Sequence, residues 1–202
     1  MTLTSTTAPT NSFTAARRAM IDSQLRTSGV NEDFVLARMN AVPREDFVPQ
    51  NARGTAYIDR AILLDNGRRI AAPLFYGMVL AEAQPNSSDS VLVVDAGSGY
   101  LAELVRPLVA SVEIISPEEA TQVSRKRTAF SLILIDGAAE QIPEALAKRL
   151  ADGGRLVTGL SDRGVTRLAT GRKSGSDVAL LPLAEIGIPR LAEFDKAESW
   201  SF

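Results

Sequence analysis

Hydrophobic residues in the second half of the chain gather in short continuous runs, separated by charged or turn-forming stretches. The runs are rich in valine, isoleucine and leucine, which is typical of strands buried on both faces of a parallel sheet. They are VLVVD (91–95), VEIIS (112–116), SLILID (131–136) and RLVTGL (155–160). Beyond them, a turn at TGRKSGSD (170–177) and the apolar stretch VALLPLAEI (178–186) predict a C-terminal antiparallel hairpin.

The stretches between these runs are predicted to be helical. LAELVR (101–106) continues as a helix until Pro107 bends or ends it. The charged stretch 117–130 is expected to form a second helix. Pro143 begins a third, PEALAKRL, which a turn at 151–154 ends. Strands that alternate with helices indicate an open, largely parallel α/β sheet.

The residues before the first run predict a helical N-terminal cap. Apolar side chains recur at helical spacing over 13–26. Asn31 is expected to cap a second helix that stops at Pro43, and Pro73 suits the first turn of a third.

Length and charge narrow the class of protein. A chain of 202 residues is enough for one domain with a full core. We expect a flexible tail at 1–12 and a single domain at 13–202, with the cap at 13–90 and the sheet core at 91–202. The net charge of -2 gives no basic excess for nucleic-acid binding. No apolar run approaches the roughly 18 residues that span a bilayer, and the N-terminus lacks the pattern of a secretory signal. These features predict a cytoplasmic protein that binds neither nucleic acid nor membrane.

The chain contains no cysteine and no histidine. Nucleophilic triads that use a histidine base are therefore excluded, as are thiolate metal sites and the histidine ligands of most zinc sites. We expect no metal, and any chemistry must use carboxylates, hydroxyls, amines and backbone groups.

The glycine-rich stretch AGSGY follows the first strand, where sheets of this kind bind ligands. Glycines let the backbone approach a ligand, and amide groups at the helix start face it. Asp95 can accept hydrogen bonds from a ligand amine or hydroxyl. Gly97, Gly99 and Ala102 match a dinucleotide fingerprint, but that fingerprint also needs an acid at the end of the second strand, where Ser116 stands. A tight turn without a ligand is the simpler alternative.

Several blocks of the sequence resemble the protein-L-isoaspartate O-methyltransferases. These blocks are MIDSQLRTSGV (20–30), VLARMNAVPREDFVP (35–49), AYID (56–59), VLVVDAGSGY (91–100) and SLILIDGAAEQIPEALAKRLADGGRLV (131–157). The pattern V-P-R-E-x-F-V-P is specific, and VLVVDAGSGY is similar to the family's cofactor loop V-L-E-I-G-x-G-S-G-Y. The resemblance implies a Rossmann-like methyltransferase fold. It also implies methyl transfer from S-adenosylmethionine to isoaspartyl carboxylates of damaged proteins, which is a form of protein repair.

The resemblance also implies a set of cofactor-binding residues. These are Asp95, Ala96, Gly97, Ser98, Gly99, Tyr100, Ser116, Asp136 and Gly137. In the family, the motif I-S-x-P carries an active-site serine, and Ala71 takes its place here, so no catalytic residue is assigned. Asp136 stands in IDGAA, where the family has V-T-A-A-A.

Two further departures concern the end of the second strand. Ser116 occupies the position of the acid that holds the cofactor ribose, and Glu113, Glu118 and Glu119 are alternatives. The connection 117–130 has room for a helix with its turns only, because a parallel crossover needs about a dozen residues. We therefore expect the sheet to be shortened by one strand, together with the wall that helps hold adenine.

Loss of that strand makes VEIIS a sheet edge, which tends to pair or to be covered. We expect a homodimer across this edge or a cover from the N-terminal region. For function, three hypotheses remain: an isoaspartate-repair methyltransferase acting on a protein or peptide, a methyltransferase with another substrate, and a non-catalytic binding or scaffold protein of the same family. Methylation of a carboxylate needs no strong base, because the group is ionised above a pKa of about 4.

Overall fold

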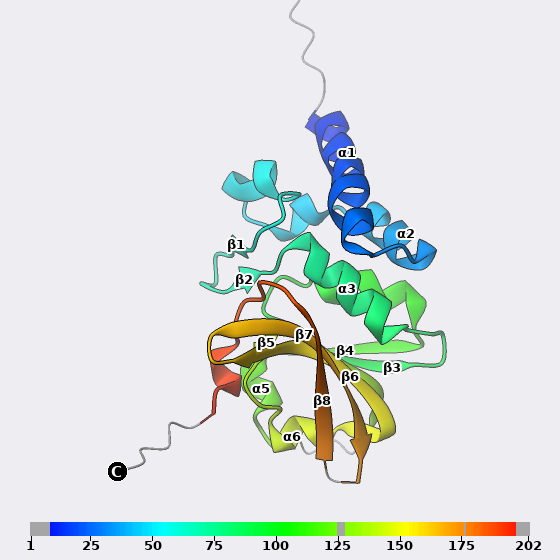
Figure 1. Cartoon of the computed structure of the whole chain (residues 1–202), viewed down its shortest axis with the longest axis vertical. Coiled ribbons are helices and arrows are strands. Elements are labelled where there is room, and N and C mark those ends of the chain that lie inside the picture. Colours follow the sequence, from blue (N-terminus) through cyan, green and yellow to red (C-terminus); the bar gives the residue numbers. More distant parts are fainter. Residues whose placement is uncertain (1–8, 125–127, 176, 197–202) are drawn as a thin grey trace, which may run out of the picture.

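A six-stranded sheet forms the centre of the computed structural model, which describes residues 9–124, 128–175 and 177–196 (Figure 1). In sheet order the strands are β4 (Ser111–Ile115), β3 (Ser90–Val94), β5 (Phe130–Ala139), β6 (Leu150–Asp162), β7 (Val165–Ser174) and β8 (Asp177–Glu185). The first four are parallel, while β7 and β8 run antiparallel to their neighbours. The predicted sheet and its C-terminal hairpin are confirmed.

Helices cover both faces of the sheet. The helical elements and the short strands of the cap are α1 (Pro9–Met20), η1 (Ile21–Leu25), η2 (Arg26–Ser28), α2 (Asp33–Ala41), η3 (Arg44–Phe47), η4 (Gln50–Thr55), β1 (Ile62–Leu63), β2 (Arg69–Ile70), α3 (Pro73–Ala83), α4 (Tyr100–Val105), η5 (Arg106–Leu108), α5 (Pro117–Ala120), α6 (Glu144–Ala147) and η6 (Ala192–Phe194). The helices α3 and α4 pack on one face, under α1 and α2, and the helices α5 and α6 pack on the other (Figure 1).

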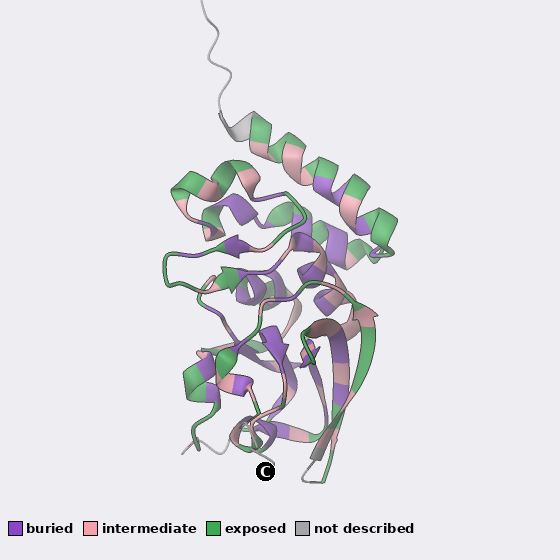
Figure 2. Ribbon diagram, turned by 60° about the vertical axis from the view of Figure 1, so that its left-hand side comes forward, coloured by how far each residue is buried: buried purple, intermediate pink, exposed green. Residues whose placement is uncertain are grey.

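The continuous apolar runs arise because the central strands are buried on both sides. Along β3, Val91 and Val93 belong to the core shared with α3 and α4. Leu92 and Val94 alternate with them and belong to the second core, on the α5 and α6 side. All four side chains are fully buried, as Figure 2 shows for the middle of the molecule.

A buried arginine joins the cap to the sheet core. Arg44 is fully buried, and its guanidinium lies 5.4 Å from the ring centroid of Tyr76 and 5.2 Å from that of Tyr100. It donates hydrogen bonds to the carbonyl oxygens of Ala56 and Ala71. The specific V-P-R-E segment therefore fixes the positions of three separate parts of the chain.

The connection between β4 and β5 is only partly as expected. No strand lies between β4 and β5 along the described part of the chain, so β4 is a sheet edge, as predicted. The helix predicted over 117–130 is wrong beyond its first turn, since α5 ends at Ala120. The capping box of Ser116 starts this helix, but Val123 is 83% exposed and offers no apolar face to bury.

Several other boundaries also differ from the prediction. Asn31 does not cap α2, whose N-cap is Glu32 without a side-chain bond. Residues 151–154 lie inside β6 as an irregular start, with a register shift against β5, instead of forming a separate turn. The hairpin turn predicted over 170–177 is much shorter, since β7 continues to Ser174.

The tail predicted at 1–12 also needs correction, because its last residues belong to α1. Residues 1–8 lie outside the described part of the chain. None of the described helices is long and apolar enough to cross a membrane.

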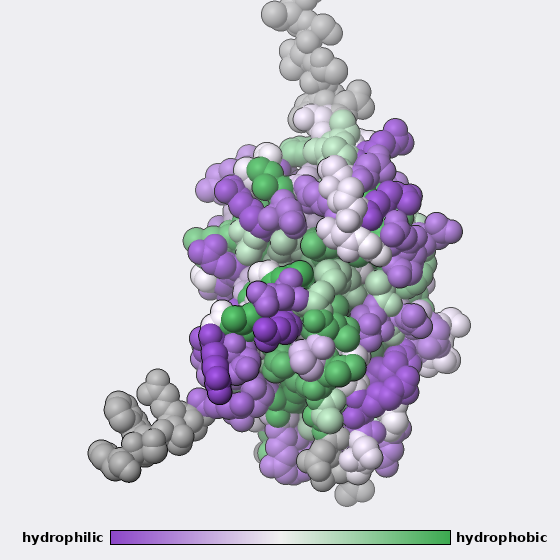
Figure 3. Space-filling model, viewed as in Figure 1, coloured by the Kyte–Doolittle hydropathy of each residue, from purple (hydrophilic) through white to green (hydrophobic). Residues whose placement is uncertain are grey.

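The two edges of the sheet differ in character. β4 pairs on one side with β3, and no described N-terminal segment adds a strand on its other side. Its Ile114 is 44% exposed. At the other edge, β8 exposes Leu181 and Leu183, and apolar side chains gather over it in Figure 3.

Replacement of Arg44 tests its role as the link between cap and core. In Arg44→Ala, two buried carbonyls lose their donor and a cavity is left, so the free energy of unfolding should fall by about 3 kcal/mol or more. Arg53→Ala is the control, because the Arg53–Asp46 pair is exposed and 4.0 Å long, and its loss should cost about 0.5 kcal/mol. Urea unfolding measures both, and equal losses would contradict the assignment.

Candidate functional site

The parallel strands bring three predicted site positions to one edge of the sheet. Asp95 follows β3, Ser116 follows β4, and Asp136 lies in the last part of β5. Because the three strands are neighbours in the order β4-β3-β5, their carboxyl ends lie side by side. We call this edge, with the loop 95–99, the strand-end site.

The loop after β3 folds around its own carboxylate. Gly97 has a φ of 98° and Gly99 a φ of 72°, a region that glycine adopts without steric cost. Their backbone amides donate to the Asp95 carboxylate, at N–O distances of 2.8 and 2.9 Å. The Ser98 hydroxyl accepts from the Tyr100 amide at 3.2 Å. The loop therefore has the conformation of an anion-binding site, in which its backbone amides bind the carboxylate of Asp95.

Asp136 is the most perturbed carboxyl group at this edge. Its side chain is buried, and it accepts hydrogen bonds from the Tyr76 hydroxyl at 2.8 Å and the Ser98 hydroxyl at 3.3 Å. Burial, followed by the negative charge of Asp95, raises the pKa of Asp136 to about 7. The site thus holds two acids, one of which titrates near neutral pH.

A hydrogen-bond chain connects Ala71 to this acid. The Ala71 amide donates to the Tyr76 hydroxyl at 3.2 Å, and that hydroxyl donates to Asp136. Burial raises the pKa of Tyr76 well above its ordinary value, so the hydroxyl keeps its proton. Ala71 itself is buried. The structure therefore places the methyl group of Ala71 beside the network, which it joins through its backbone alone.

Tyr100, predicted to bind cofactor, lies in the core. Its ring is fully buried and makes an edge-to-face contact with Tyr76, with centroids 4.9 Å apart. Phe47 packs on it at 5.2 Å. In this arrangement the aromatic ring supports the loop from below.

Ser116 and the three candidate glutamates near the end of β4 all form hydrogen bonds or ion pairs with other residues. Ser116 and Glu119 form the capping box of α5, with the Ser116 hydroxyl accepting from the Glu119 amide. Glu113 pairs with Arg149 at 2.6 Å. Glu118 pairs with Arg68, from the turn between β1 and β2. Of the three glutamates, Glu118 is thus the one connected to the turn that contacts the glycine loop.

Two segments that the sequence analysis did not single out lie over the strand-end site. The turn 64–68 contacts the glycine loop, since the side-chain amide nitrogen Nδ2 of Asn66 donates to the Ala96 carbonyl at 3.2 Å. The segment 189–194 contacts β5, with the Leu191 amide donating to the Ala138 carbonyl at 2.9 Å. We call these two segments the strand-end cover. The sequence signal for the turn was Asn66-Gly67, a typical turn dipeptide.

The glycines beneath this cover allow close contact. A Cβ on Gly97 would collide with the Asn66 side chain, and a Cβ on Gly137 would lie 2.6 Å from Leu191 Cγ. Gly137, predicted to bind cofactor, therefore accommodates Leu191 here. The predicted residues Asp95, Ala96, Gly97, Ser98 and Asp136 are brought together, whereas Ser116 serves as a helix cap.

A small cavity remains between the two segments of the cover. Its volume is about 320 Å³, and Ala96, Arg68, Leu191 and Glu193 are among the residues that line it. This volume lies at the lower limit of small-molecule pockets, which are about 300–1,000 Å³.

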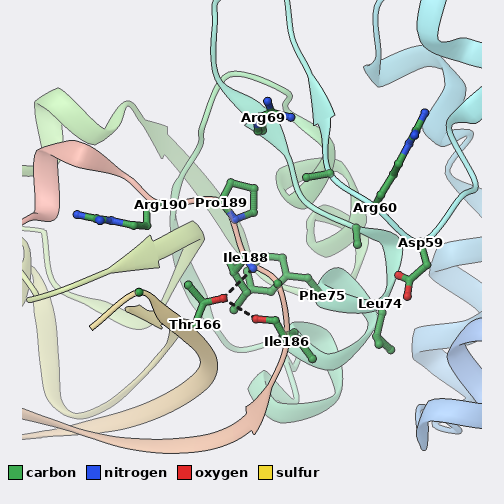
Figure 4. Close-up of a pocket in the computed structure, with 14 residues that line it drawn as sticks. Asp59, Arg60, Arg69, Leu74, Phe75, Thr166, Ile186, Ile188, Pro189 and Arg190 are labelled. Atoms are coloured by element: carbon green, nitrogen blue, oxygen red, sulfur yellow. Dashed lines mark hydrogen bonds between the residues drawn. The ribbon is translucent and has the colours of Figure 1, made fainter. Parts of the chain in front are cut away.

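A larger cavity of about 610 Å³ adjoins it, since Arg69, Pro189 and Arg190 line both. Figure 4 shows the arginine side chains at the rim of this second cavity, with Phe75 on the floor. Thr166 fixes one wall, because its hydroxyl donates to the Ile186 carbonyl at 2.6 Å (Figure 4).

A parallel sheet with helices on both faces, a C-terminal antiparallel hairpin and a glycine loop after the strand at the switch point defines the class of Rossmann-like methyltransferases. A family model described as protein-L-isoaspartate(D-aspartate) O-methyltransferase (PCMT) matches residues 15–129. The chain belongs to the protein-L-isoaspartate O-methyltransferase family.

Individual relatives agree with this assignment. The protein-L-isoaspartate O-methyltransferase of Roseiflexus castenholzii is 31% identical over 86% of this chain and 90% of the relative. That of Methanoculleus marisnigri is 28% identical over 88% of this chain and 92% of the relative. A Plasmodium falciparum structure, described as a protein-L-isoaspartate O-methyltransferase in complex with S-adenosyl-L-homocysteine, superposes with a TM-score of 0.71 at 17% identity. The superposition covers 90% of this chain and 98% of the Plasmodium falciparum chain, and it shows that the two have the same fold.

The raised pKa of Asp136 predicts a pH-dependent stability. The folded protein keeps this proton up to about pH 7, whereas the group ordinarily ionises near 3.8. Between these values the folded state holds the extra proton, so the free energy of unfolding should fall as the pH rises from 4 to 7. At about 1.4 kcal/mol per pKa unit, the loss reaches up to about 4 kcal/mol.

Asp136→Asn removes the titrating group and keeps an acceptor for Tyr76, so its stability should be flatter over this range and higher than wild type at pH 8. Asp162→Asn, at an exposed position, is the control and should follow the wild-type profile. Urea unfolding at pH 5 and pH 8 measures the difference. A wild-type stability that rises with pH over this range, with no flattening in Asp136→Asn, would contradict the prediction.

Proposed function

We propose that this chain is an S-adenosylmethionine-dependent methyltransferase that acts on isoaspartyl carboxyl groups of proteins. The observation that carries the proposal is the strand-end site itself, in a chain of this family. Two positive-φ glycines follow β3, and Asp95 and Asp136 meet at the same edge. A cavity large enough for a peptide side chain adjoins that edge.

The residues present fit this cofactor in their charge and backbone. Two acids at one edge favour a cationic ligand, because a positive charge relieves the repulsion between them. S-adenosylmethionine carries a sulfonium and an ammonium group, and when bound it supplies the methyl group. The loop Asp95–Gly99 and Asp136 are the proposed binding residues, with Glu118 the proposed substitute for the acid at the ribose. A Cβ on Gly99 meets nothing within 4 Å, so the space beside this residue is open.

The reaction needs positioning more than it needs a base. The acceptor carboxylate is already ionised at neutral pH, with an ordinary pKa of about 4. The chain must therefore hold the carboxylate in line with the methyl group and exclude water. We assign the acceptor to the 610 Å³ cavity, where Arg60 and Arg69 stand at the rim and Phe75 forms an apolar floor. A protein with these substrates is proposed to work in the cytoplasm.

Calorimetry and methyl transfer test the proposal together. S-adenosylhomocysteine should bind at micromolar concentration, and a peptide with an isoaspartyl residue should accept labelled methyl groups while its aspartyl isomer does not. The absence of heat at millimolar ligand would overturn cofactor binding. Binding without transfer to the isoaspartyl peptide would instead favour another substrate.

A matched pair of glycine variants locates the binding. Gly99 and Gly175 both have positive φ and open space at the Cβ position, so alanine strains both backbones alike. Gly99→Ala should weaken binding of S-adenosylhomocysteine about tenfold or more, while Gly175→Ala, in the β7–β8 turn at the opposite end of the sheet, should not. If both variants weaken binding equally, the glycine loop does not bind the ligand.

A second candidate function is a non-catalytic family member. The observation in its favour is that the loop amides already bind Asp95 and that the strand-end cover fills space above them. This candidate predicts no affinity for S-adenosylmethionine or S-adenosylhomocysteine in any variant.

We also propose that two copies pair through β4. Its outer edge has no partner strand among the described residues, and Ile114 is exposed there. Ile114→Lys should convert the dimer to a monomer in light scattering. Leu181→Lys, a similar change on β8 at the opposite edge, should leave the dimer intact. A wild-type protein that is monomeric at tens of micromolar would contradict the proposal.

A further inference from the structure

Arg68 holds three separate segments of the chain together over the strand-end site. Its guanidinium bonds both oxygens of Glu193, at 2.9 and 3.2 Å, and the carboxylate of Glu118. Glu193 belongs to η6, Glu118 is the second residue of α5, and Arg68 ends the turn of the β1–β2 hairpin. The arginine and Glu193 side chains are both 24% exposed, so this pair is partly shielded from water.

This contact closes the two halves of the strand-end cover on each other. Asn66, two residues before Arg68, rests on Gly97 and bonds the Ala96 carbonyl. Leu191, two residues before Glu193, rests on Gly137. The Arg68–Glu193 pair therefore joins the segment that touches the glycine loop to the segment that touches the end of β5.

The closed cover leaves little room for a ligand. The cavity between its two segments measures about 320 Å³, and both Arg68 and Glu193 are part of its wall. An adenosyl amino acid that lies along the strand ends would need the space that Asn66 fills above Gly97 and that Leu191 fills above Gly137. Entry of such a ligand therefore requires the cover to move.

We propose that Arg68 is the latch of a closed, ligand-excluding form, and that release of its bonds to Glu193 and Glu118 opens the strand-end site. The identity of the ligand in this inference rests on the proposed function. The coupling between the two halves of the cover is independent of that function. The latch is a positioning device, and Arg68 takes no part in the chemistry.

Neutral variants that retain hydrogen-bonding capacity test the latch from both sides. Arg68→Gln and Glu193→Gln each remove the charge pair. Their controls are Arg53→Gln and Glu144→Gln, which break the exposed pairs with Asp46 and Lys148. Thermal unfolding first establishes that all four variants are folded.

Hydrogen exchange measures opening without any ligand. In both latch variants the amides of Gly67, Leu191 and the loop residues Gly97 and Gly99 should exchange faster together, although they are far apart in sequence. The control variants should match the wild type. Unchanged exchange in the two latch variants would overturn the proposal.

Calorimetry with S-adenosylhomocysteine gives the second readout. Each latch variant should bind about three- to tenfold more tightly than the wild type, as expected for removal of a competing charge pair. Added salt should tighten binding to the wild type and have little effect on Arg68→Gln, because it screens the latch. Weaker binding by Arg68→Gln would overturn the latch and make Arg68 a ligand contact.

The two readouts separate the latch from the proposed function. Faster, coupled exchange in the latch variants without any binding would support the latch and reject the cofactor. Tight binding by all proteins with unchanged exchange would support the cofactor and reject the latch.

Discussion

The buried guanidinium of Arg44 is the interaction on which cap, core and site all depend. Its desolvation is costly, and it is offset by the carbonyl oxygens of Ala56 and Ala71 and by the faces of the Tyr76 and Tyr100 rings. Burial and the charge of Asp95 raise the pKa of Asp136, and the positive charge of Arg44 opposes that rise, more weakly than the hydrogen bonds from Tyr76 and Ser98. The residue that attaches the cap therefore also belongs to the electrostatic environment of the strand-end site.

The glycine loop is stable without a ligand because it contains its own anion. The Asp95 carboxylate satisfies the amides of Gly97 and Gly99, which would otherwise need water or a ligand. A ligand carboxyl group must displace the Asp95 carboxylate, which the chain holds permanently beside these amides. A cationic ligand group is instead attracted by the pair Asp95 and Asp136. The charges at this site therefore favour a cationic ligand group over an anionic one.

The central sheet was predictable from sequence because burial on both faces forces continuous apolar runs, as in β3 and β5. The glycine loop was predictable because positive φ at Gly97 requires glycine. The cover was not, since Asn66 and Arg68 have the pattern of an ordinary surface turn, and their roles arise from partners more than 25 residues away. The predicted ends of helices were also wrong where capping and tertiary burial, more than helix propensity, set the boundary.

The shortened crossover explains why such a cover is possible. Pro117 starts α5 directly at the end of β4, and Glu119 is held in the capping box. Glu118 therefore projects from the first turn, where Arg68 reaches it. A longer connection with another strand would place different residues at this point. The short connection thus creates the anchor for the segment that covers the strand-end site.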